Sequence, residues 1–299
     1  MFKGSLVALI TPYKDGSLDE KALEKLVQWH LAEGTQGILA CGSTGEGALL
    51  SHAEQKRVLT LCIRSAGGQL PIIANASAIR LEDALALARQ AQDTGVQGLM
   101  FTPPPYIRPT QEAIYQFMKT VHDETHLPII VYDNPGRCGV AIARETVARL
   151  VKLPRITTYK DSTGNITGIS ELTPLTPSSF TLLCGDDPLN AAFLAQGGHG
   201  WISVTANAAP RLCAQFYQAW EQGNLKEFAR LRDQLTPLNR AIFLETSPSP
   251  IKYAVAQQGF CSDEVRRPLL KATAMARAAV DRALEHAGIK AAHRKVRHG

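Results

Sequence analysis

Residues 72–102, IIANASAIRLEDALALARQAQDTGVQGLMFT, contain two short apolar runs separated by one amphipathic stretch. The runs 72–75 and 98–102 have the length and composition of buried β-strands. The stretch 81–94 has helical spacing and ends at Gly95, and glycine is common just past a helix C-terminus. A strand, a helix and a second strand in this order predict two parallel strands joined by a helical crossover.

The same strand–helix unit recurs along the first two thirds of the chain. Eight apolar runs are predicted as strands, at 6–10, 37–40, 72–75, 98–102, 128–132, 156–160, 181–184 and 200–204. Helices are predicted between them, at 18–34, 51–67, 81–94, 111–125, 144–151, 167–175 and 188–196. Two helix starts, Ser17–Glu20 and Ser51–Glu54, have the pattern of a capping box. Eight β/α units favour a closed (β/α)8 TIM barrel over an open sheet.

No strand pattern follows Pro210. Helical patterns cover residues 211–222, 225–243, 250–258 and 268–286. We therefore expect a catalytic barrel over residues 1–225 and a C-terminal helical region over residues 226–299.

The composition is that of an ordinary globular protein. Hydrophobic residues make up 45% and charged residues 20% of the 299 residues, so one large core can form. The formal net charge is +5, and four of the positive charges lie in the tail 290–299. We interpret this tail as a solvated terminus rather than a nucleic-acid-binding segment. Without the tail the charge is near zero, so no nucleic-acid partner is expected.

Three features of the sequence predict a cytoplasmic location. The six cysteines are scattered without a CxxC pair, which fits a reducing compartment better than a disulfide framework. The first residues lack the apolar core and the cleavage site of a secretory signal. No run of about 18 apolar residues occurs, so no membrane partner is expected.

The active site of a (β/α)8 barrel lies where the strands end and the following loops begin. Lys160 ends the sixth predicted strand, which should be buried on both faces. Burial disfavours the charged form of a lysine, and the neutral amine is the form that attacks a carbonyl to make an imine. On position alone, it is an equally good alternative that the strand ends one residue earlier and that Lys160 is solvated.

Three other polar groups follow strands. Tyr132 ends the neighbouring strand, where a phenol suits proton transfer or simple packing inside the barrel. Ser43 and Thr44 lie in a glycine-bounded turn whose hydroxyl and amide groups suit a carboxylate, although a plain turn explains them as well. Arg137 lies in a Pro-Gly loop, where its guanidinium suits a carboxylate or solvent.

Other kinds of site have weaker support. Asp186 and Asp187 have no histidine near them in sequence, so a loop or helix-capping role is expected rather than a metal site. The nucleotide-binding patterns GxxxxGK[ST] and GxGxxG are absent from the sequence.

Together these segments resemble the dihydrodipicolinate synthase and N-acetylneuraminate lyase family, over nearly the whole chain. No single segment is specific, but their order is. The segments are GSTGE (42–46), TPPPYIRPTQE (102–112), YDNPGRCG (132–139), YKDSTGN (159–165), GDD (185–187) and GGHGWISVTAN (197–207).

The resemblance implies catalytic roles. Lys160 would form a Schiff base with pyruvate, and Tyr132 would relay protons. Thr44 would link Tyr132 to Tyr106, which would reach in from a neighbouring subunit. No metal or organic cofactor is implied, because the imine itself is the electron sink. The partners implied are small molecules, and the implied assembly is a homotetramer built from tight dimers.

The resemblance also implies binding roles. Ser43 and Thr44 would hold the carboxylate of pyruvate, and Arg137 would hold the carboxylate of the second substrate. Gly185 and Ile202 would line the lysine pocket through backbone groups.

The implied reaction is the condensation of pyruvate with aspartate 4-semialdehyde to 4-hydroxy-tetrahydrodipicolinate, a step of lysine biosynthesis. The alternative is a related pyruvate-dependent aldolase or dehydratase that acts on a sugar-acid or hydroxyproline-derived 2-oxo acid. A barrel that only binds or regulates is a third hypothesis, which the joint presence of all the catalytic side chains disfavours.

The chain departs from the usual synthase pattern at several positions. Ser43 stands where the motif GTTGE has threonine, which is a chemically close change. The sequence NASA (75–78) replaces a GTGA-type turn that faces the site, so the substrate preference stays open. Asp133, Asn134 and Cys138 also differ.

Lysine-inhibited members of the family carry His, Asn, Glu and Tyr at the effector site. The corresponding residues here are Gln55, Ile79, Asp83 and Pro105. We therefore expect this protein to be insensitive to lysine.

Overall fold

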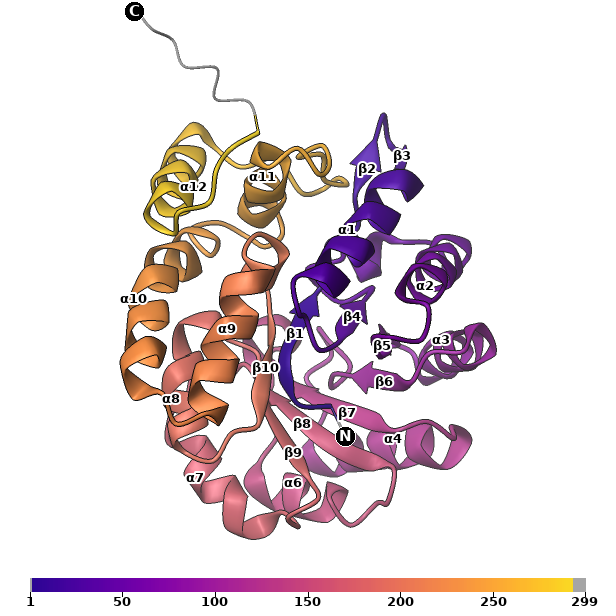
Figure 1. Cartoon of the computed structure of the whole chain (residues 1–299). Helices are drawn as coiled ribbons and strands as arrows, with labels where there is room; N and C mark the ends of the chain where they lie inside the picture. The colour runs from indigo at the N-terminus through magenta and orange to yellow at the C-terminus, as the bar shows by residue number, and fades with distance from the viewer. Residues whose placement is uncertain (1, 293–299) are drawn as a thin grey trace, which may run out of the picture.

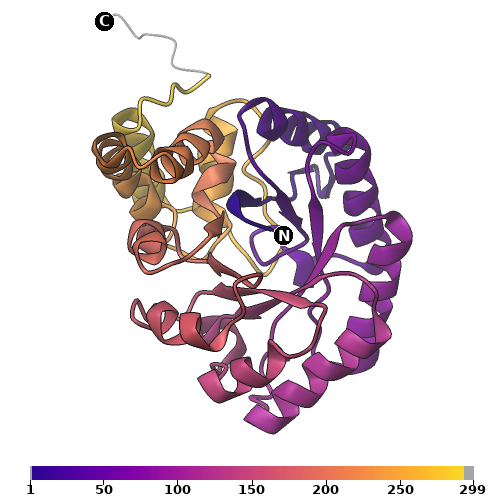
Figure 2. The same cartoon turned by 60° about the horizontal axis from the view of Figure 1, so that its bottom comes forward.

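Eight parallel strands close into a barrel in the order β1-β10-β9-β8-β7-β6-β5-β4 in the computed structural model (Figure 2). The structure describes residues 2–292, so positions 293–299 of the predicted basic tail lie outside the described residues. The barrel strands are β1 (Gly4–Ala8), β4 (Ile38–Ala40), β5 (Ile72–Asn75), β6 (Gly98–Phe101), β7 (Ile129–Asp133), β8 (Ile156–Asp161), β9 (Thr181–Cys184) and β10 (Gly200–Ser203). The predicted (β/α)8 barrel is confirmed.

Helices surround the barrel as an outer layer (Figures 1 and 2). The longer ones are α1 (Glu20–Ala32), α2 (His52–Ala66), α3 (Leu81–Thr94), α4 (Gln111–Glu124) and α9 (Pro210–Glu221). Shorter helices are α5 (Pro135–Cys138), α6 (Arg144–Leu150), α7 (Gly168–Leu172), α8 (Asn190–Ala195) and the 3-10 turns η1 (Gly47–Leu49), η2 (Thr173–Leu175), η3 (Asp187–Leu189) and η4 (Thr205–Asn207). Within the described residues, none of the helices combines the length and apolar character needed to cross a membrane.

One predicted helix start is confirmed and the other is wrong. Ser51 caps α2 in a complete capping box with Glu54. Ser17 does not cap α1, because β2 (Tyr13–Lys14) and β3 (Ser17–Leu18) form a small hairpin there. The hairpin draws Ser17 into a strand, and Asp19 caps the helix by accepting a hydrogen bond from the Ala22 N–H.

The C-terminal helices α10 (Leu225–Ala241), α11 (Ser249–Gln257) and α12 (Ala274–His286) pack beside the barrel (Figure 1). The predicted start of the last helix at Pro268 is wrong. Thr273 is the N-cap of α12 and its hydroxyl accepts from the Ala276 N–H. The preceding segment is irregular because Arg266 bonds to the α2 region and Pro268 and Leu269 line a cavity.

Two hydrophobic cores follow from the alternation of side chains along the strands. One fills the space between strands and helices. The other fills the inside of the barrel, and its members are Phe2, Leu6, Ala8, Leu39, Ile73, Met100, Ile130, Tyr132, Leu183 and Ile202. Tyr132 therefore points into the barrel, while the next residue, Asp133, points outward.

Candidate active site

Lys160 and Tyr132 lie side by side at the carboxyl ends of two neighbouring strands. Their Cα atoms are partners in the parallel register of β7 and β8. Lys160 is 4% exposed, and its Nζ lies 3.9 Å from the centroid of the Tyr132 ring. Strand β8 continues to Asp161, so the alternative in which Lys160 is solvated beyond the strand end is wrong.

The Tyr132 phenol is held by two side chains of the same subunit. The Asn134 Nδ2 donates to the phenol oxygen at 2.7 Å, and the Ser162 hydroxyl lies 3.2 Å from it. Within the part of the chain that the structure describes, no hydrogen bond joins the phenol to Thr44, the partner that the resemblance implies.

Gly185 leaves room for the lysine. A Cβ at this position would lie 2.2 Å from the Ser162 Oγ and 2.7 Å from the Lys160 Cε. The absence of a side chain at Gly185 therefore lets the serine hydroxyl and the end of the lysine occupy the same small space. Ile202 on β10 is buried in the barrel interior.

Ser43 and Thr44 belong to a tight turn after β4 that is fixed at both ends. Cys41 and Glu46 have φ values of 57° and 55°, in the left-handed region that is uncommon for residues other than glycine. The N–H groups of Ser43 and Thr44 donate to no carbonyl among the described residues. Consecutive amides of this kind form a ready site for an anion.

The far end of this turn is anchored by a buried ion pair that the sequence did not reveal. Glu46 Oε1 lies 2.5 Å from Lys252 Nζ, and both side chains are 0% exposed. Glu46 Oε2 accepts from the Arg266 N–H at 2.8 Å, and Lys252 Nζ donates to the Glu264 carbonyl at 2.7 Å. Neither partner has a sequence signal of its own, because the two stand about 200 residues apart in the chain.

A cavity of about 340 Å³ opens above Tyr132 at the carboxyl ends of the strands. Ser43, Asn75, Ser77 and Arg137 line it, together with residues of the C-terminal region. The Ser247 carbonyl accepts from the exposed Arg137 guanidinium at 3.4 Å. The C-terminal region thus contributes to the site wall, which the strand-end rule alone does not predict.

Tyr106 stands apart from the other site residues in this subunit. It is 88% exposed and has a φ of 73°, so a strained loop holds its ring in solvent. Ile79 and Ile107 are also exposed, large and apolar.

Two carboxyl groups lie just behind the reactive pair, at the paired positions Asp133 and Asp161. Burial raises the pKa of Asp133 to about 6, although the Tyr159 hydroxyl and the Ile142 N–H both donate to it. Burial also raises the pKa of Asp161.

Asp187 has the structural role expected of it. Its Oδ2 accepts from the N–H groups of Val204 and Thr205 at 2.8 and 3.1 Å. Among the described residues, no group of three His, Cys, Asp or Glu side chains is arranged to hold a metal ion.

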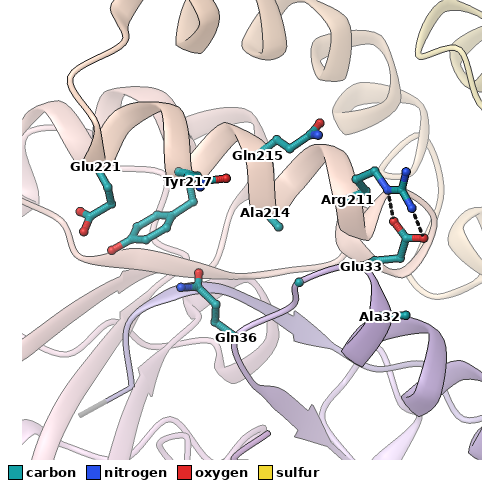
Figure 3. A pocket seen from close by; sticks show the side chains of 10 residues that line it. Ala32, Glu33, Gln36, Arg211, Ala214, Gln215, Tyr217 and Glu221 are labelled. Atoms are coloured by element: carbon teal, nitrogen blue, oxygen red, sulfur yellow. Dashed lines mark hydrogen bonds and ion pairs between the residues drawn. The ribbon is translucent and has the colours of Figure 1, made fainter. Parts of the chain in front are cut away.

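A larger cavity, of about 630 Å³, lies between α9 and the turn that follows α1 (Figure 3). Arg211 and Glu33 are paired there, since Arg211 donates to both oxygens of Glu33, and Glu221 lies at the other end of the cavity. The residues described as lining this larger cavity include no lysine, so the smaller cavity above Tyr132, the neighbour of Lys160, is the candidate active site.

The family model described as "Dihydrodipicolinate synthetase family" matches residues 1–287. The chain belongs to this family. It is 44% identical to the 4-hydroxy-tetrahydrodipicolinate synthase of Rhodospirillum centenum, over 97% of this chain and 99% of that protein.

Solved structures of the dihydrodipicolinate synthetase family superpose closely on the barrel. The dihydrodipicolinate synthase of Aquifex aeolicus matches with a TM-score of 0.95 and 34% identity, over 97% of this chain and 100% of that one. The chloride-inhibited enzyme of Acinetobacter baumannii, solved with pyruvate, matches with a TM-score of 0.94 and 35% identity, again over 97% and 100%.

Proposed function

We propose that this protein is a 4-hydroxy-tetrahydrodipicolinate synthase that condenses pyruvate with aspartate 4-semialdehyde. The observation that carries the proposal is the buried amine of Lys160 against the ring of Tyr132, beneath a cavity lined by Ser43 and Arg137. The name and the high coverage of the relatives support the same reaction.

The first half of the reaction makes an enamine. The Lys160 nitrogen attacks C2 of pyruvate, the carbonyl oxygen leaves as water, and an imine forms. The free amides and hydroxyls of Ser43 and Thr44 hold the pyruvate carboxylate. Loss of a C3 proton then gives the enamine, with Tyr132 as the acid and base of these transfers.

The second half joins the two substrates. Arg137 binds the carboxylate of the aldehyde at the cavity mouth through charge-assisted hydrogen bonds. The enamine carbon forms a bond to the aldehyde carbon, and the amine of the second substrate attacks the imine carbon. The bond to Lys160 then breaks, which frees the amine and closes the ring.

One observation favours the alternative substrate class. Asn75 and Ser77 place an amide and a hydroxyl in the cavity wall, where they bond to each other at 2.7 Å. Such groups suit a hydroxylated 2-oxo acid, which a related aldolase or dehydratase would use.

The remaining site residues and the assembly are part of the same proposal. Gly185 and Ile202 line the lysine pocket, and Thr44 and Tyr106 extend the proton relay, with Tyr106 inserted into a second copy. The exposure of Tyr106, Ile79 and Ile107 supports such a contact, in a homotetramer built from tight dimers. All six cysteines are free thiols, which supports a cytoplasmic location.

The test is the initial rate with pyruvate and aspartate semialdehyde, coupled to a dihydrodipicolinate reductase and followed by NADPH consumption. A kcat of about 1–10³ s⁻¹ that Lys160→Ala abolishes is the expected result. Negligible turnover, with pyruvate still trapped on Lys160 by borohydride, would refute aspartate 4-semialdehyde as the second substrate and favour the alternative substrate class.

A further inference from the structure

The side chain of Asn134 joins the phenol of Tyr132 to the short helix that carries Arg137. Its Oδ1 accepts a hydrogen bond from the Arg137 N–H at 3.2 Å and so caps α5. Its Nδ2 donates to the phenol oxygen of Tyr132 at 2.7 Å. Asn134 is half-buried and lines the cavity above Tyr132, so both ends of one amide are in use at the candidate active site.

The direction of this amide follows from the helix cap. A backbone N–H can only donate, so the oxygen end of the amide must face Arg137. The nitrogen end also only donates, and it is left facing the phenol. The phenol oxygen of Tyr132 must therefore accept from Asn134, and its own hydrogen must point elsewhere.

The contact leaves the proposed relay of protons intact. A phenol oxygen has two lone pairs and one hydrogen for hydrogen bonds. Asn134 takes one lone pair, and the Ser162 hydroxyl, 3.2 Å away, takes a second of these three positions. The third remains for the hydroxyl of Thr44, the next member of the relay in the proposed function. Asn134 is only a donor to the phenol, so it transfers no proton itself.

The start of α5 depends on Asn134 in two ways. The Asn134 carbonyl accepts from the N–H groups of Arg137 and Cys138 at 3.0 and 2.9 Å, in addition to the side-chain cap. The guanidinium of Arg137 has only a long contact with the Ser247 carbonyl, at 3.4 Å, so its position depends on its backbone. Loss of the Asn134 side chain would weaken the start of this four-residue helix, while the carbonyl bonds remain.

We propose that Asn134 is a positioning residue that serves both halves of the reaction. Through Nδ2 it turns the phenol hydrogen of Tyr132 away from α5, and through Oδ1 it holds the backbone of Arg137. This inference rests on the proposed function, in which Tyr132 is the acid and base and Arg137 binds the aldehyde carboxylate. Asn134 is also a position at which the chain departs from the usual synthase pattern, and the proposed relay gives it no role.

The test separates the two ends of the amide. Asn134→Ser keeps a neutral cap for α5, because serine is a preferred N-cap residue, but it lacks the amide nitrogen that contacts the phenol. Imine formation with pyruvate alone is followed by rapid mixing, borohydride quench and mass spectrometry of the adduct. We expect Asn134→Ser to slow this step about 10-fold, the upper end for one neutral hydrogen bond, while the KM for the aldehyde stays near the wild-type value.

Two further variants complete the comparison. Asn134→Ala removes both ends of the amide, so it should slow imine formation to the same extent and also raise the KM for the aldehyde. Asn165→Ser is the matched control, because Asn165 is an exposed residue of the loop after β8. Its Oδ1 accepts only from the N–H and the hydroxyl of Thr167, so the control should keep the wild-type rate.

A double variant decides whether Asn134 acts through the phenol. Tyr132→Phe removes the oxygen that Nδ2 contacts, so adding Asn134→Ser to it should slow imine formation no further. An equal fold-loss in both backgrounds would mean that Asn134 only supports the local fold, and it would overturn the inference. A wild-type imine rate in Asn134→Ser would overturn it as well. Absence of any adduct in the wild-type protein would instead refute the proposed function itself.

Discussion

Replacement of Lys252 by methionine should destabilise the protein through the charge that it leaves behind. Lys252 and Glu46 are both fully buried, with 2.5 Å between Nζ and Oε1. Among the described residues, Glu46 Oε1 makes no hydrogen bond of its own, so the ammonium is what compensates it. Burial lowers the pKa of Lys252, while Glu46 opposes that shift. Methionine fills a similar volume without a charge, so the change removes the electrostatic partner and little else.

The expected cost is that of an uncompensated buried charge, about 3–5 kcal/mol. At roughly 2–4 °C per kcal/mol, the midpoint of thermal unfolding should fall on the order of 10 °C. The pyruvate KM should rise as well, because Glu46 fixes the left-handed end of the turn that carries Ser43 and Thr44.

The assays are urea unfolding, for the free energy, and thermal unfolding, for the midpoint temperature; both are followed by circular dichroism at one fixed protein concentration because assembly adds to apparent stability. The double variant Glu46→Gln with Lys252→Met should recover most of the loss, since it removes both charges. Lys271→Met is the matched control, because Lys271 pairs with Asp263 at an exposed position and such pairs contribute only about 0–1 kcal/mol. If Lys252→Met costs no more than Lys271→Met, the reasoning about the buried pair is refuted.

Four further predictions follow from the site. Gly185→Ala should abolish the borohydride-trapped pyruvate adduct on Lys160 without loss of the far-UV spectrum, because the new Cβ collides with the lysine and with Ser162; an unchanged adduct yield would contradict this. Arg137→Ala should lower kcat/KM for the aldehyde about 10–150-fold, from 1.5–3 kcal/mol for a charged hydrogen bond, and leave the pyruvate adduct intact; equal losses for both substrates would argue against the assigned role. Burial raises the pKa of Asp133 from 3.8 to about 6, so the folded state favours the neutral carboxyl. The resulting stabilisation is complete below the unfolded-state pKa of 3.8 and is lost as the pH rises through 6. Asp133→Asn should therefore raise the unfolding midpoint more at pH 8 than at pH 5, and an equal gain at both would refute the assignment. Finally, lysine at millimolar concentration should leave the coupled rate unchanged, and clear inhibition would disprove the expected insensitivity.

The sequence by itself determined the architecture. Runs of four or five apolar residues alternate with helical spacing, and eight such units favour a closed parallel barrel, so the strand count and the position of Lys160 at a strand end were both predictable. The Ser51 capping box was also predictable, because its two partners, Ser51 and Glu54, are only three residues apart in the sequence. The prediction that Ser17 caps a helix was wrong, because the Asp15-Gly16 turn forms a hairpin that places Ser17 in a strand.

Only the tertiary structure decided how the site is closed. Lys252 meets Glu46, Ser247 accepts from Arg137, and Ser162 faces Tyr132 across separate elements. Contacts of this kind depend on strand register and on the fold of the C-terminal helices, and no periodic pattern encodes them. The sequence specified which chemical groups follow the strands, and packing around the barrel determined which of them share a hydrogen bond.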